Sequence, residues 1–455
     1  MKNHNKYIHT LKSSPFGTPF YYAGNKLLNE HKSLLNDAEK IIIQSVSDVI
    51  GPVLISYCIW IIQKARKSGL QKLYFLARDG KILMEICKVL IQHYKLDIEC
   101  KYLYVSRYSL RKALFSINPD EALRYICRNS LSVTPASILQ RSGLSSNIQQ
   151  QVLLELGYST ESQQSIPLTP KELDSFYLML KESKLFCSEM QAMSEEYNTI
   201  IYEYFQEQGI ANGTHIAIVD SGWTGSIQRC IRQILSYNKV NVSIEGFYFG
   251  IQSLPKREDG IYNWFYFGPQ NYYEYIHFNN NLFECWCMAD HGMTIGYQKN
   301  NNEVVPILNK HAPQHYAIIQ SDALKQYALF FTEYQHDLQS IPIEQLTSLV
   351  RPLLIRFMTH PDRDEAAVYG SIPFCDDTTE MHLCPLAAPL SMLDLCKNLT
   401  IIKCINKILK PVKQIAIRES GWREGTIANL PLPMNWIMYI DSQLSYFVKM
   451  IAYKH

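Results

Sequence analysis

Short apolar runs that end in polar turns, each followed by an amphipathic segment, recur in the first 250 residues. KLYFLARDG (72–80) reads as a buried strand ending in Arg-Asp-Gly, and KILMEICKVLIQHY (81–94) has helical spacing. KYLYVSRYSL (101–110) predicts a second strand. The pattern returns in HIAIVDSGWTGSIQ (215–228) and VSIEGFYFGI (242–251). Strands that alternate with helices predict an α/β fold with a mainly parallel, Rossmann-like sheet flanked by helices.

Helical patterns surround these strands. We expect a helix that opens at Pro52 and ends at Gly69, because proline suits a first helical turn and glycine a helix end. Residues 115–210 are polar and helix-like, which indicates an insertion into the α/β core. Residues 255–300 are aromatic and irregular. From 315 onward the pattern is helical again, with a turn-rich break at 359–377.

These patterns divide the chain into three predicted parts. Residues 1–49 form an N-terminal helical segment, and residues 50–300 form the α/β core with its helical insertion at 115–210. Residues 301–455 form a helical C-terminal region. The helical insertion and the C-terminal helices are expected to cap the carboxyl edge of the sheet and to shape a groove there.

Charge and cysteine content exclude several classes of protein. The 455 residues carry a formal net charge of +2, which argues against a nucleic-acid binder that works through bulk electrostatics. The twelve cysteines include no CxxC pair, so a zinc site is not indicated. The longest apolar run, 53–62, is about half of what a membrane span requires. The N-terminus has no signal-peptide pattern, and we expect a cytoplasmic protein.

The turn DSGWTGS offers groups that suit a phosphate. A strand that ends here and leads into a helix presents backbone N–H groups and a helix N-terminus to one point. Gly222 and Gly225 permit a tight turn, while Thr224 and Ser226 add hydroxyl donors. Asp220 is placed to accept hydrogen bonds from sugar hydroxyls at the strand end. An ordinary strand-to-helix connection is the alternative.

A second polar loop, FLARDG, has the same position after a strand. Arg78 could grip a phosphate with two hydrogen bonds, and Asp79 beside it could hold a water of hydrated Mg²⁺, with Gly80 completing the loop. A structural ion pair at a turn is the alternative for Arg78 and Asp79. Two anion-suited loops on one sheet indicate a ligand with phosphate at both ends.

Further candidates surround these loops. Arg107 could meet a diphosphate, although a solvated basic turn explains it equally well. Glu284 and His291 are polar groups among aromatic residues, and one of them could accept a proton from a hydroxyl. The alternative for this pair is a hydrogen-bonded buried acid and a core histidine. Trp223 could pack on a ligand or in the core.

Several blocks together resemble a known family. YFLARDGKIL, YLYVSRYSL, VDSGWTGSIQ, GFYFG and LFECWCMADHG are similar to motifs of a bacterial polysaccharide-biosynthesis phosphoribosyltransferase family. The resemblance covers roughly residues 50–300, with fainter similarity in HPDRDEAAVYGSIPF and GWREG. The two loops also resemble, distantly, those of type I phosphoribosyltransferases. The second of two adjacent acids usual in that class is Ser221 here, which leaves open whether Asp220 alone handles the ribose hydroxyls.

The resemblance implies a reaction. Family members are implicated in moving ribose 5-phosphate from phosphoribosyl diphosphate (PRPP) to a hydroxyl of a surface glycan, an O-antigen or capsule, with release of diphosphate. Mg²⁺ is the implied cofactor, bound by Asp79, through water, and by Asp220. The implied catalytic residues are Asp220, Asp79 and Glu284. The resemblance further implies a lipid-linked glycan acceptor and a separate HAD-type phosphatase that removes the 5-phosphate.

Two other functions were weighed. A nucleotide-sugar glycosyltransferase would need a metal-binding D-x-D, and the sole candidate is Asp362-Arg363-Asp364. The preceding Pro361 argues against a strand end and favours a loop or a helix start. A HAD phosphatase is disfavoured for the same reason. A non-catalytic assembly protein remains the second alternative.

The last candidate is a basic segment. KNLTIIKCINKILKPVKQIAIR (397–418) carries five lysines and one arginine with no acid, and its apolar residues have helical spacing. Such a helix favours weak peripheral contact with anionic lipid at the inner face of the cytoplasmic membrane. A surface helix with solvated lysines is the alternative. Pro411 weakens the membrane interpretation, because proline breaks or kinks a helix.

Overall fold

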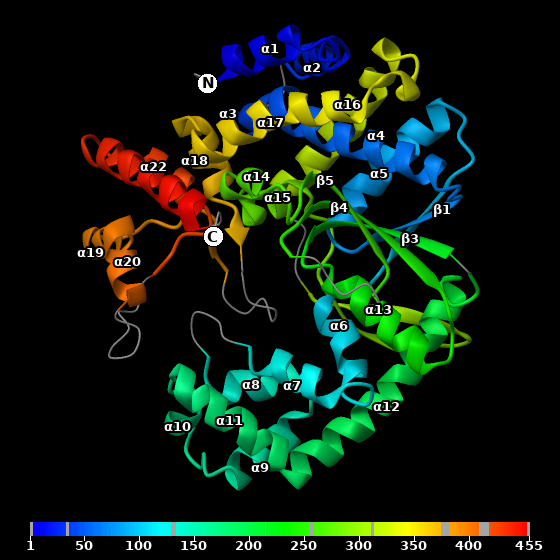
Figure 1. The fold of residues 1–455 in the computed structure, drawn as a ribbon, viewed down its shortest axis with the longest axis vertical. Helices are drawn as coiled ribbons and strands as arrows, with labels where there is room; N and C mark the ends of the chain where they lie inside the picture. Colours follow the sequence, from blue (N-terminus) through cyan, green and yellow to red (C-terminus); the bar gives the residue numbers. More distant parts are fainter. Residues whose placement is uncertain are drawn as a thin grey trace.

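The fold was analysed in a computed structural model of the chain, drawn in Figure 1. The described residues are 3–32, 36–128, 133–213, 215–253, 259–310, 314–374, 383–408 and 418–452.

The centre of the molecule is a five-stranded sheet with the order β2-β1-β3-β4-β5. Every neighbouring pair is parallel. The strands are β1 (Lys72–Leu76), β2 (Glu99–Leu103), β3 (His215–Trp223), β4 (Ser243–Ile251) and β5 (Ile261–Phe267). The predicted α/β class with a mainly parallel sheet is therefore confirmed.

Alternating side chains of the strands enter two separate cores. On β1 and β3, Leu73, Phe75 and Val219 join one apolar cluster, while Tyr74 and Ile218 join another. The first cluster lies under helices α4 (Gly51–Lys67) and α5 (Gly80–His93), and the second includes residues of α13 (Ser226–Tyr237). Both faces of the sheet are thus covered, as parallel sheets require.

The helix expected from Pro52 begins earlier than predicted. α3 (Asp37–Ser45) runs through a π-helical turn, η1 (Val46–Ile50), directly into α4, so Pro52 lies inside one continuous helix. The helix Asp37–Lys67 is long and apolar enough to cross a membrane by length and composition, but its apolar window is entirely buried in the protein. It is therefore best described as a core helix.

Helices from both ends of the chain pack over this core helix (Figure 1). The N-terminal pair α1 and α2 lies beside α16 and α17, which follow the core in sequence. Their bounds are α1 (His4–Ser13), α2 (Thr18–Glu30), α16 (His315–Tyr334), η4 (Leu338–Ser340), α17 (Ile343–Thr359) and α18 (Arg363–Gly370).

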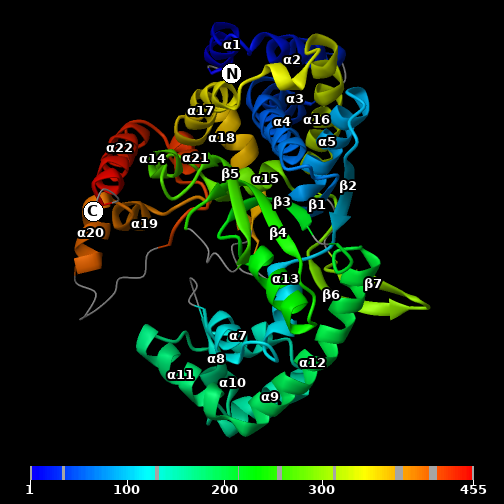
Figure 2. The same ribbon diagram turned by 45° about the vertical axis from the view of Figure 1, so that its right-hand side comes forward.

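The predicted insertion forms a helical lobe that lies apart from the upper helices, as Figures 1 and 2 show. Its long last helix, α12, returns the chain to β3. The elements are α6 (Arg107–Arg111), η2 (Lys112–Leu114), α7 (Pro119–Ile126), α8 (Pro135–Ser142), α9 (Ser146–Glu155), α10 (Glu161–Ser165), α11 (Pro170–Glu182) and α12 (Lys184–Glu207).

The region 255–300, expected to be irregular, holds regular elements. It contains β5 at the edge of the main sheet, two short helices, and the first strand of an antiparallel hairpin. These elements are α14 (Tyr272–Ile276), α15 (Asn280–Trp286), β6 (Thr294–Asn300) and β7 (Glu303–Leu308). The tyrosines and phenylalanines that hid a strand pattern are packed against one another in the core.

The remaining elements form a small C-terminal lobe. They are β8 (Pro373–Phe374), β9 (Cys384–Pro385), α19 (Met392–Lys397), α20 (Thr400–Ile408), α21 (Arg423–Asn429) and α22 (Met434–Ala452). Part of the predicted basic segment, residues 409–417 with Lys410 and Pro411, lies outside the described residues.

Candidate functional site

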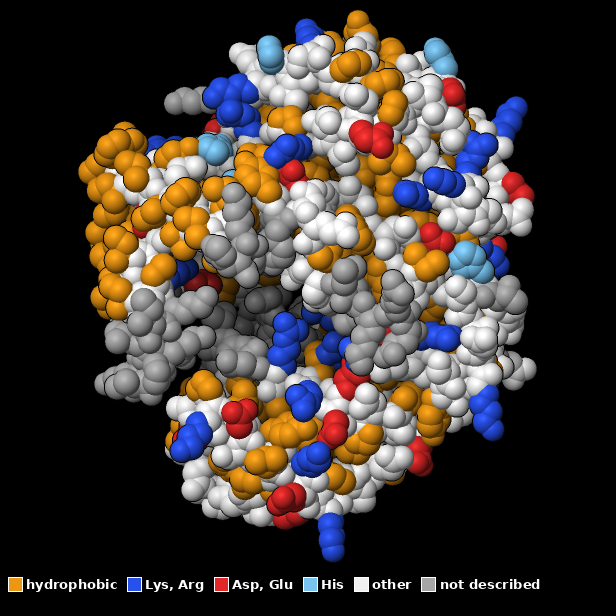
Figure 3. Space-filling view, in the orientation of Figure 1, with side chains coloured by type: hydrophobic (Ala, Val, Ile, Leu, Met, Phe, Trp, Pro, Cys, Tyr) orange, Lys and Arg blue, Asp and Glu red, His pale blue; other side chains and the backbone are white. Residues whose placement is uncertain are grey.

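A cavity of about 400 Å³ lies where the carboxyl edge of the sheet meets the helical lobe. Figure 3 shows a hollow in this part of the molecule, with Lys and Arg side chains at its rim. The lining residues come from the segments after β1, β2 and β3, from the helical lobe and from the chain after β4. They are Ala77–Asp79, Val105–Tyr108, Asp220–Thr224, Ser226, Ile227, Tyr125, Arg128, Arg141, Gln252, Asn280, Asn281, Glu284, Met293, Thr294 and Phe374.

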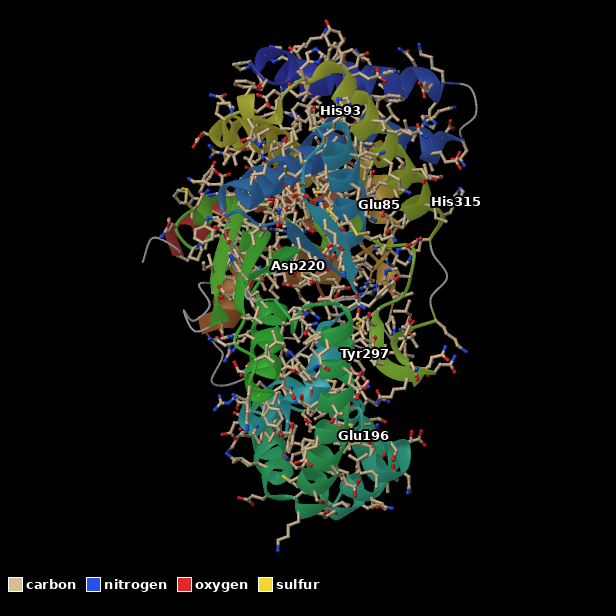
Figure 4. The ribbon with its side chains drawn as sticks, turned by 90° about the vertical axis from the view of Figure 1, so that its right-hand side faces the viewer. Glu85, His93, Glu196, Asp220, Tyr297 and His315 are labelled. Carbon is tan, nitrogen blue, oxygen red and sulfur yellow. The ribbon has the colours of Figure 1, made fainter. Side chains whose placement is uncertain are left out.

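The two polar loops predicted from the sequence meet in this cavity. Phe75 pairs with Val219, so the loops after β1 and β3 leave the sheet side by side. The hydroxyl of Ser221 donates a hydrogen bond to the Asp79 carboxylate. Figure 4 labels Asp220 near the middle of the molecule, above the helical lobe. Asp79 and Asp220 therefore lie at the same, carboxyl edge of the sheet.

Two glycines give the β3 loop its shape. Gly222 has a φ of 141°, and a Cβ atom there would lie 2.1 Å from the carbonyl oxygen of Gly250 on β4. Gly225, with a φ of 61°, caps α13, and a Cβ atom there would meet the ring of Tyr262 at 2.3 Å. Both positions therefore require glycine, through left-handed backbone and close approach together.

Asp220 is the most buried acid of the site, with 8% of its surface exposed. Burial raises the pKa of its carboxyl well above the ordinary value, and the nearby Asp79 raises it further. Its backbone carbonyl accepts a hydrogen bond of 2.8 Å from the hydroxyl of Tyr57 on α4. That tyrosine also donates to the carbonyl of Phe247, which ties β3 to β4 just below the loop.

Asp79 and Glu284 complete a group of three acids. Burial raises the pKa of Asp79, while the hydrogen bond from Ser221 and the charges of Arg78 and Arg107 lower it. Burial and the charge of Asp79 raise the pKa of Glu284 to about 7. The carboxyl groups therefore disfavour one another's ionisation, which is a feature of functional sites.

Trp223 and Glu284 are joined across the cavity. The indole N–H of Trp223 donates a hydrogen bond of 2.7 Å to Glu284 Oε1. The indole also stacks on Phe267, with ring centroids 5.9 Å apart. Trp223 therefore packs on the aromatic core, one of the two places predicted for it, and its indole N–H orients the acid.

Cationic and hydroxyl groups flank the acids. Arg78 and Arg107 line the cavity on the side of β1 and β2, and Arg107 is exposed. Thr224 and Ser226 line it at the N-terminus of α13, a helix of twelve residues. Guanidinium groups and a helix N-terminus with hydroxyls are both suited to phosphate oxygens.

Three predicted residues do not line the cavity. Gly80 is buried against β1, where a Cβ atom would lie 2.8 Å from the carbonyl carbon of Phe75. Gly225 shapes the loop from behind. His291 bonds the hydroxyl of Tyr102 at 2.8 Å and the carbonyl of Gly292 at 2.9 Å, and burial lowers its pKa. These contacts give His291 a supporting place behind the Arg78 loop.

The sequence interpretation missed the helical-lobe wall and the polar residues of α15. Arg141 is buried and donates to the carbonyls of Ile126 and Arg128, while Tyr125 lies under the guanidinium of Arg111 at 3.4 Å. No motif marks these residues, because the folding of the lobe brings them to the cavity.

The position of Asn280 and Asn281 in the sequence weakly indicated that they belong to the site. They stand beside Glu284 in the NNLFECW run, and Asn281 donates to the carbonyl of Gly421 at 3.2 Å. Gly421 opens the GWREG block, and Phe374 in the GSIPF block also lines the cavity. The two weaker blocks of the resemblance thus lie next to the site.

The D-x-D sequence serves as a helix start. Asp362 accepts a hydrogen bond from the backbone N–H of Glu365 and the Glu365 carboxylate accepts one from the N–H of Asp362, a capping box at the N-terminus of α18. Neither Asp362 nor Asp364 lines the cavity. The expectation of a helix start is confirmed.

The donor chemistry of the cavity fits Mg²⁺. Mg²⁺ takes oxygen ligands and in phosphate-binding sites uses one or two carboxylates together with substrate phosphates. Asp79 and Asp220 supply two carboxyl groups, and burial raises the pKa of both. Among the described residues, no three His, Cys, Asp or Glu side chains form a ready metal site.

Comparisons of the chain with known protein families and with curated proteins gave no match.

Proposed function

We propose that the protein is a PRPP-dependent phosphoribosyltransferase that moves ribose 5-phosphate to a hydroxyl of a surface-polysaccharide glycan and releases diphosphate. One observation carries the proposal. The segments that follow the neighbouring parallel strands β1, β2 and β3 bring guanidinium groups, buried acids and a helix N-terminus into a single cavity. This set matches a ligand with anionic groups at both ends and a polar sugar between them.

The two phosphate ends of PRPP would contact different parts of the cavity. Thr224, Ser226 and the N-terminus of α13 would hold the 5-phosphate, because backbone N–H groups and the helix dipole favour an anion there. Arg78 and Arg107 would hold the diphosphate. Asp220 would accept hydrogen bonds from the ribose hydroxyls, and Ser221 holds Asp79 toward it.

The chemistry follows from positioning and charge. The bond from the anomeric carbon to diphosphate breaks early and leaves an oxocarbenium-like centre, which nearby carboxylates stabilise. Mg²⁺ bound to the diphosphate, with Asp79 and Asp220 as protein ligands, would supply Lewis-acid assistance to the leaving group. Arg78 and Arg107 would offset the negative charge that develops on the departing diphosphate.

Glu284 is the candidate base. Its pKa of about 7 means that it can take a proton from the acceptor hydroxyl near neutral pH, and Trp223 fixes one of its oxygens. The acceptor would enter from the wall formed by Tyr125, Arg128, Asn280 and Asn281. Aromatic and amide side chains of this kind suit the faces and hydroxyls of sugars.

Ribose transfer from labelled PRPP is the direct test. Purified protein, Mg²⁺ and a panel of synthetic oligosaccharides with apolar tails are incubated with PRPP or with nucleotide sugars. The expected product has gained ribose 5-phosphate, with diphosphate released in equal amount. Calorimetric binding of PRPP without acceptor separates a wrong acceptor from a wrong donor. Transfer from a nucleotide sugar, or no PRPP binding with Mg²⁺ present, contradicts the proposal.

A further inference from the structure

Helix α22 is built with its polar side toward the protein. The Asp441 carboxylate accepts hydrogen bonds from the backbone N–H of Thr400 at 3.0 Å and from Arg423 at 2.5 Å. The hydroxyls of Ser442 and Tyr446 donate to Glu424 at 2.9 and 2.6 Å. An ordinary surface helix turns such groups outward, so α22 is inverted relative to a helix that faces water.

The outward side of α22 is apolar. Its large hydrophobic side chains are between 40% and 63% exposed and follow one another at spacings of one, three and four residues, which places them on one face. They are Trp436, Ile437, Ile440, Leu444, Phe447 and Ile451.

Neighbouring segments extend this face. Met392 and Leu393 of α19, Ile401 and Ile405 of α20, and Leu432 before α22 are also strongly exposed. Figure 3 shows hydrophobic side chains gathered at the left of the molecule, over α22 and the helices below it. We call these side chains, together with the six of α22, the C-terminal apolar surface. Scattered exposed hydrophobic residues are normal, but a set gathered on neighbouring helices marks an interaction site.

Charge identifies the partner. α20 lies inside the segment 397–418, which has five lysines, one arginine and no acid. Of these, Lys403 pairs with Glu419 at 2.6 Å. An apolar surface with an adjoining basic segment matches the acyl chains and headgroups of an anionic bilayer. Trp436 adds an aromatic side chain of the kind enriched at membrane interfaces.

We propose that the C-terminal apolar surface docks on an anionic lipid bilayer, with α22 in the plane of the interface. This inference goes beyond the proposed transferase reaction and does not rest on it. A second copy of the chain is the rival occupant. The bilayer is favoured because the exposed side chains span three helices rather than one seam, and because the sequence 397–418, with five lysines, one arginine and no acid, favours an anionic partner over a second copy of itself.

Vesicle co-sedimentation of the full chain tests the docking. Vesicles of phosphatidylcholine alone are compared with vesicles that contain about one third phosphatidylglycerol, at low and high salt. The test variant combines Ile440→Gln, Leu444→Gln and Phe447→Gln. The control variant combines Leu154→Gln, Leu178→Gln and Ile318→Gln, three equally exposed apolar side chains on other helices. Thermal unfolding checks that both variants are folded.

The expected result is binding that requires anionic lipid, weakens with salt and falls by about tenfold or more in the test variant but not in the control. Replacing Lys407, Lys410 and Lys413 with glutamine should weaken binding at low salt as well. Equal binding of the test variant and the wild type, or no binding to either vesicle, overturns the proposal. A dimer in solution that the test variant abolishes, without vesicle binding, assigns the surface to a second copy instead.

Discussion

Charged side chains are usually exposed and apolar side chains usually buried. The cavity and the C-terminal apolar surface depart from this rule in opposite ways. At the cavity, Asp79, Asp220 and Glu284 are taken out of water close to one another, and their pKa values rise. On α22, side chains such as Trp436 and Phe447 stand in water while Asp441 is buried. Each arrangement costs stability in the isolated chain, because it leaves charge poorly solvated or apolar surface wet.

The two regions differ in what would relieve that cost. In the cavity, the charges of Arg78 and Arg107 offset part of that cost, and the acids are fixed by short contacts such as the one between Trp223 and Glu284. For the C-terminal apolar surface, contact with any apolar medium would remove the cost of exposure, and no fixed arrangement of partner groups is needed. The comparison indicates that the cavity binds a ligand of one defined shape, whereas the C-terminal apolar surface contacts an apolar medium without a defined binding geometry.

Replacement of Asp220 by asparagine should have the largest effect. The change keeps the size of the side chain and removes the carboxylate proposed to contact the ribose or Mg²⁺, so turnover should fall by about 10²–10⁴-fold. Labelled PRPP assays measure this. Asp364→Asn is the matched control, since Asp364 is exposed and lies outside the cavity. Wild-type rates in Asp220→Asn would remove Asp220 from contact with the substrate.

Gly222→Ala should disrupt the β3 loop. A Cβ atom would lie 2.1 Å from the Gly250 carbonyl oxygen in addition to the strained φ, so we expect about 3 kcal/mol of lost stability. Gly157→Ala isolates the backbone contribution, because Gly157 has a φ of 88° with nothing within 4 Å of a Cβ atom. That control should lose about 1 kcal/mol. Urea unfolding compares them, and equal losses would mean that the loop can move away from β4.

The pH profile should identify Glu284. Its pKa is raised to about 7, and a base acts when deprotonated, so the rate should rise with pH through about 7 and then level off. Trp223→Phe removes a hydrogen bond that lowers this pKa, so the rising limb should move to higher pH. Trp436→Phe, on the exposed face of α22, should leave it in place. A limb that survives unchanged in Glu284→Gln assigns the base elsewhere.

The smallest expected effect is a gain in stability in Asp220→Asn. Because the folded pKa of Asp220 lies above its unfolded value, the folded chain holds this proton to higher pH. The associated stability is present below the unfolded pKa and is lost as pH rises through the folded one. The wild-type free energy of unfolding should therefore fall with pH more steeply than that of Asp220→Asn. Urea unfolding at several pH values measures the difference, and parallel curves would contradict it.

The strand-and-loop part of the site could be predicted from the sequence. An apolar run that enters DSGWTGS or RDG is local information, and parallel strands place their carboxyl ends together. The aromatic run that became β5 was missed, because aromatic residues on both faces of the strand, such as Trp264, Phe265 and Tyr266, hide its period. The helix start predicted at Pro52 was wrong, because Pro52 lies inside a continuous helix that begins at Asp37.

The opposite wall of the cavity could not be predicted. Arg141 reaches the site through the folding of a helical lobe whose packing leaves no periodic signature beyond helix. The inversion of α22 was equally hidden, since its pattern gives one apolar stripe in either orientation. The contacts of Asp441 with Thr400 and Arg423, and those of Ser442 and Tyr446 with Glu424, show which side faces the protein.

The carbonyl of Gly421 links the C-terminal helices to the helix that carries Glu284. It accepts hydrogen bonds from Asn279 and Asn281 at the start of α15, the helix that carries Glu284. Two residues later, Arg423 begins α21 and holds Asp441 of α22. Residues 421–423 therefore contact both α15 and α22. A truncation before Gly421 should remove the contacts that support Glu284 together with the apolar face of α22. A truncation that removes Gly421 would therefore not separate the proposed reaction from the proposed membrane docking.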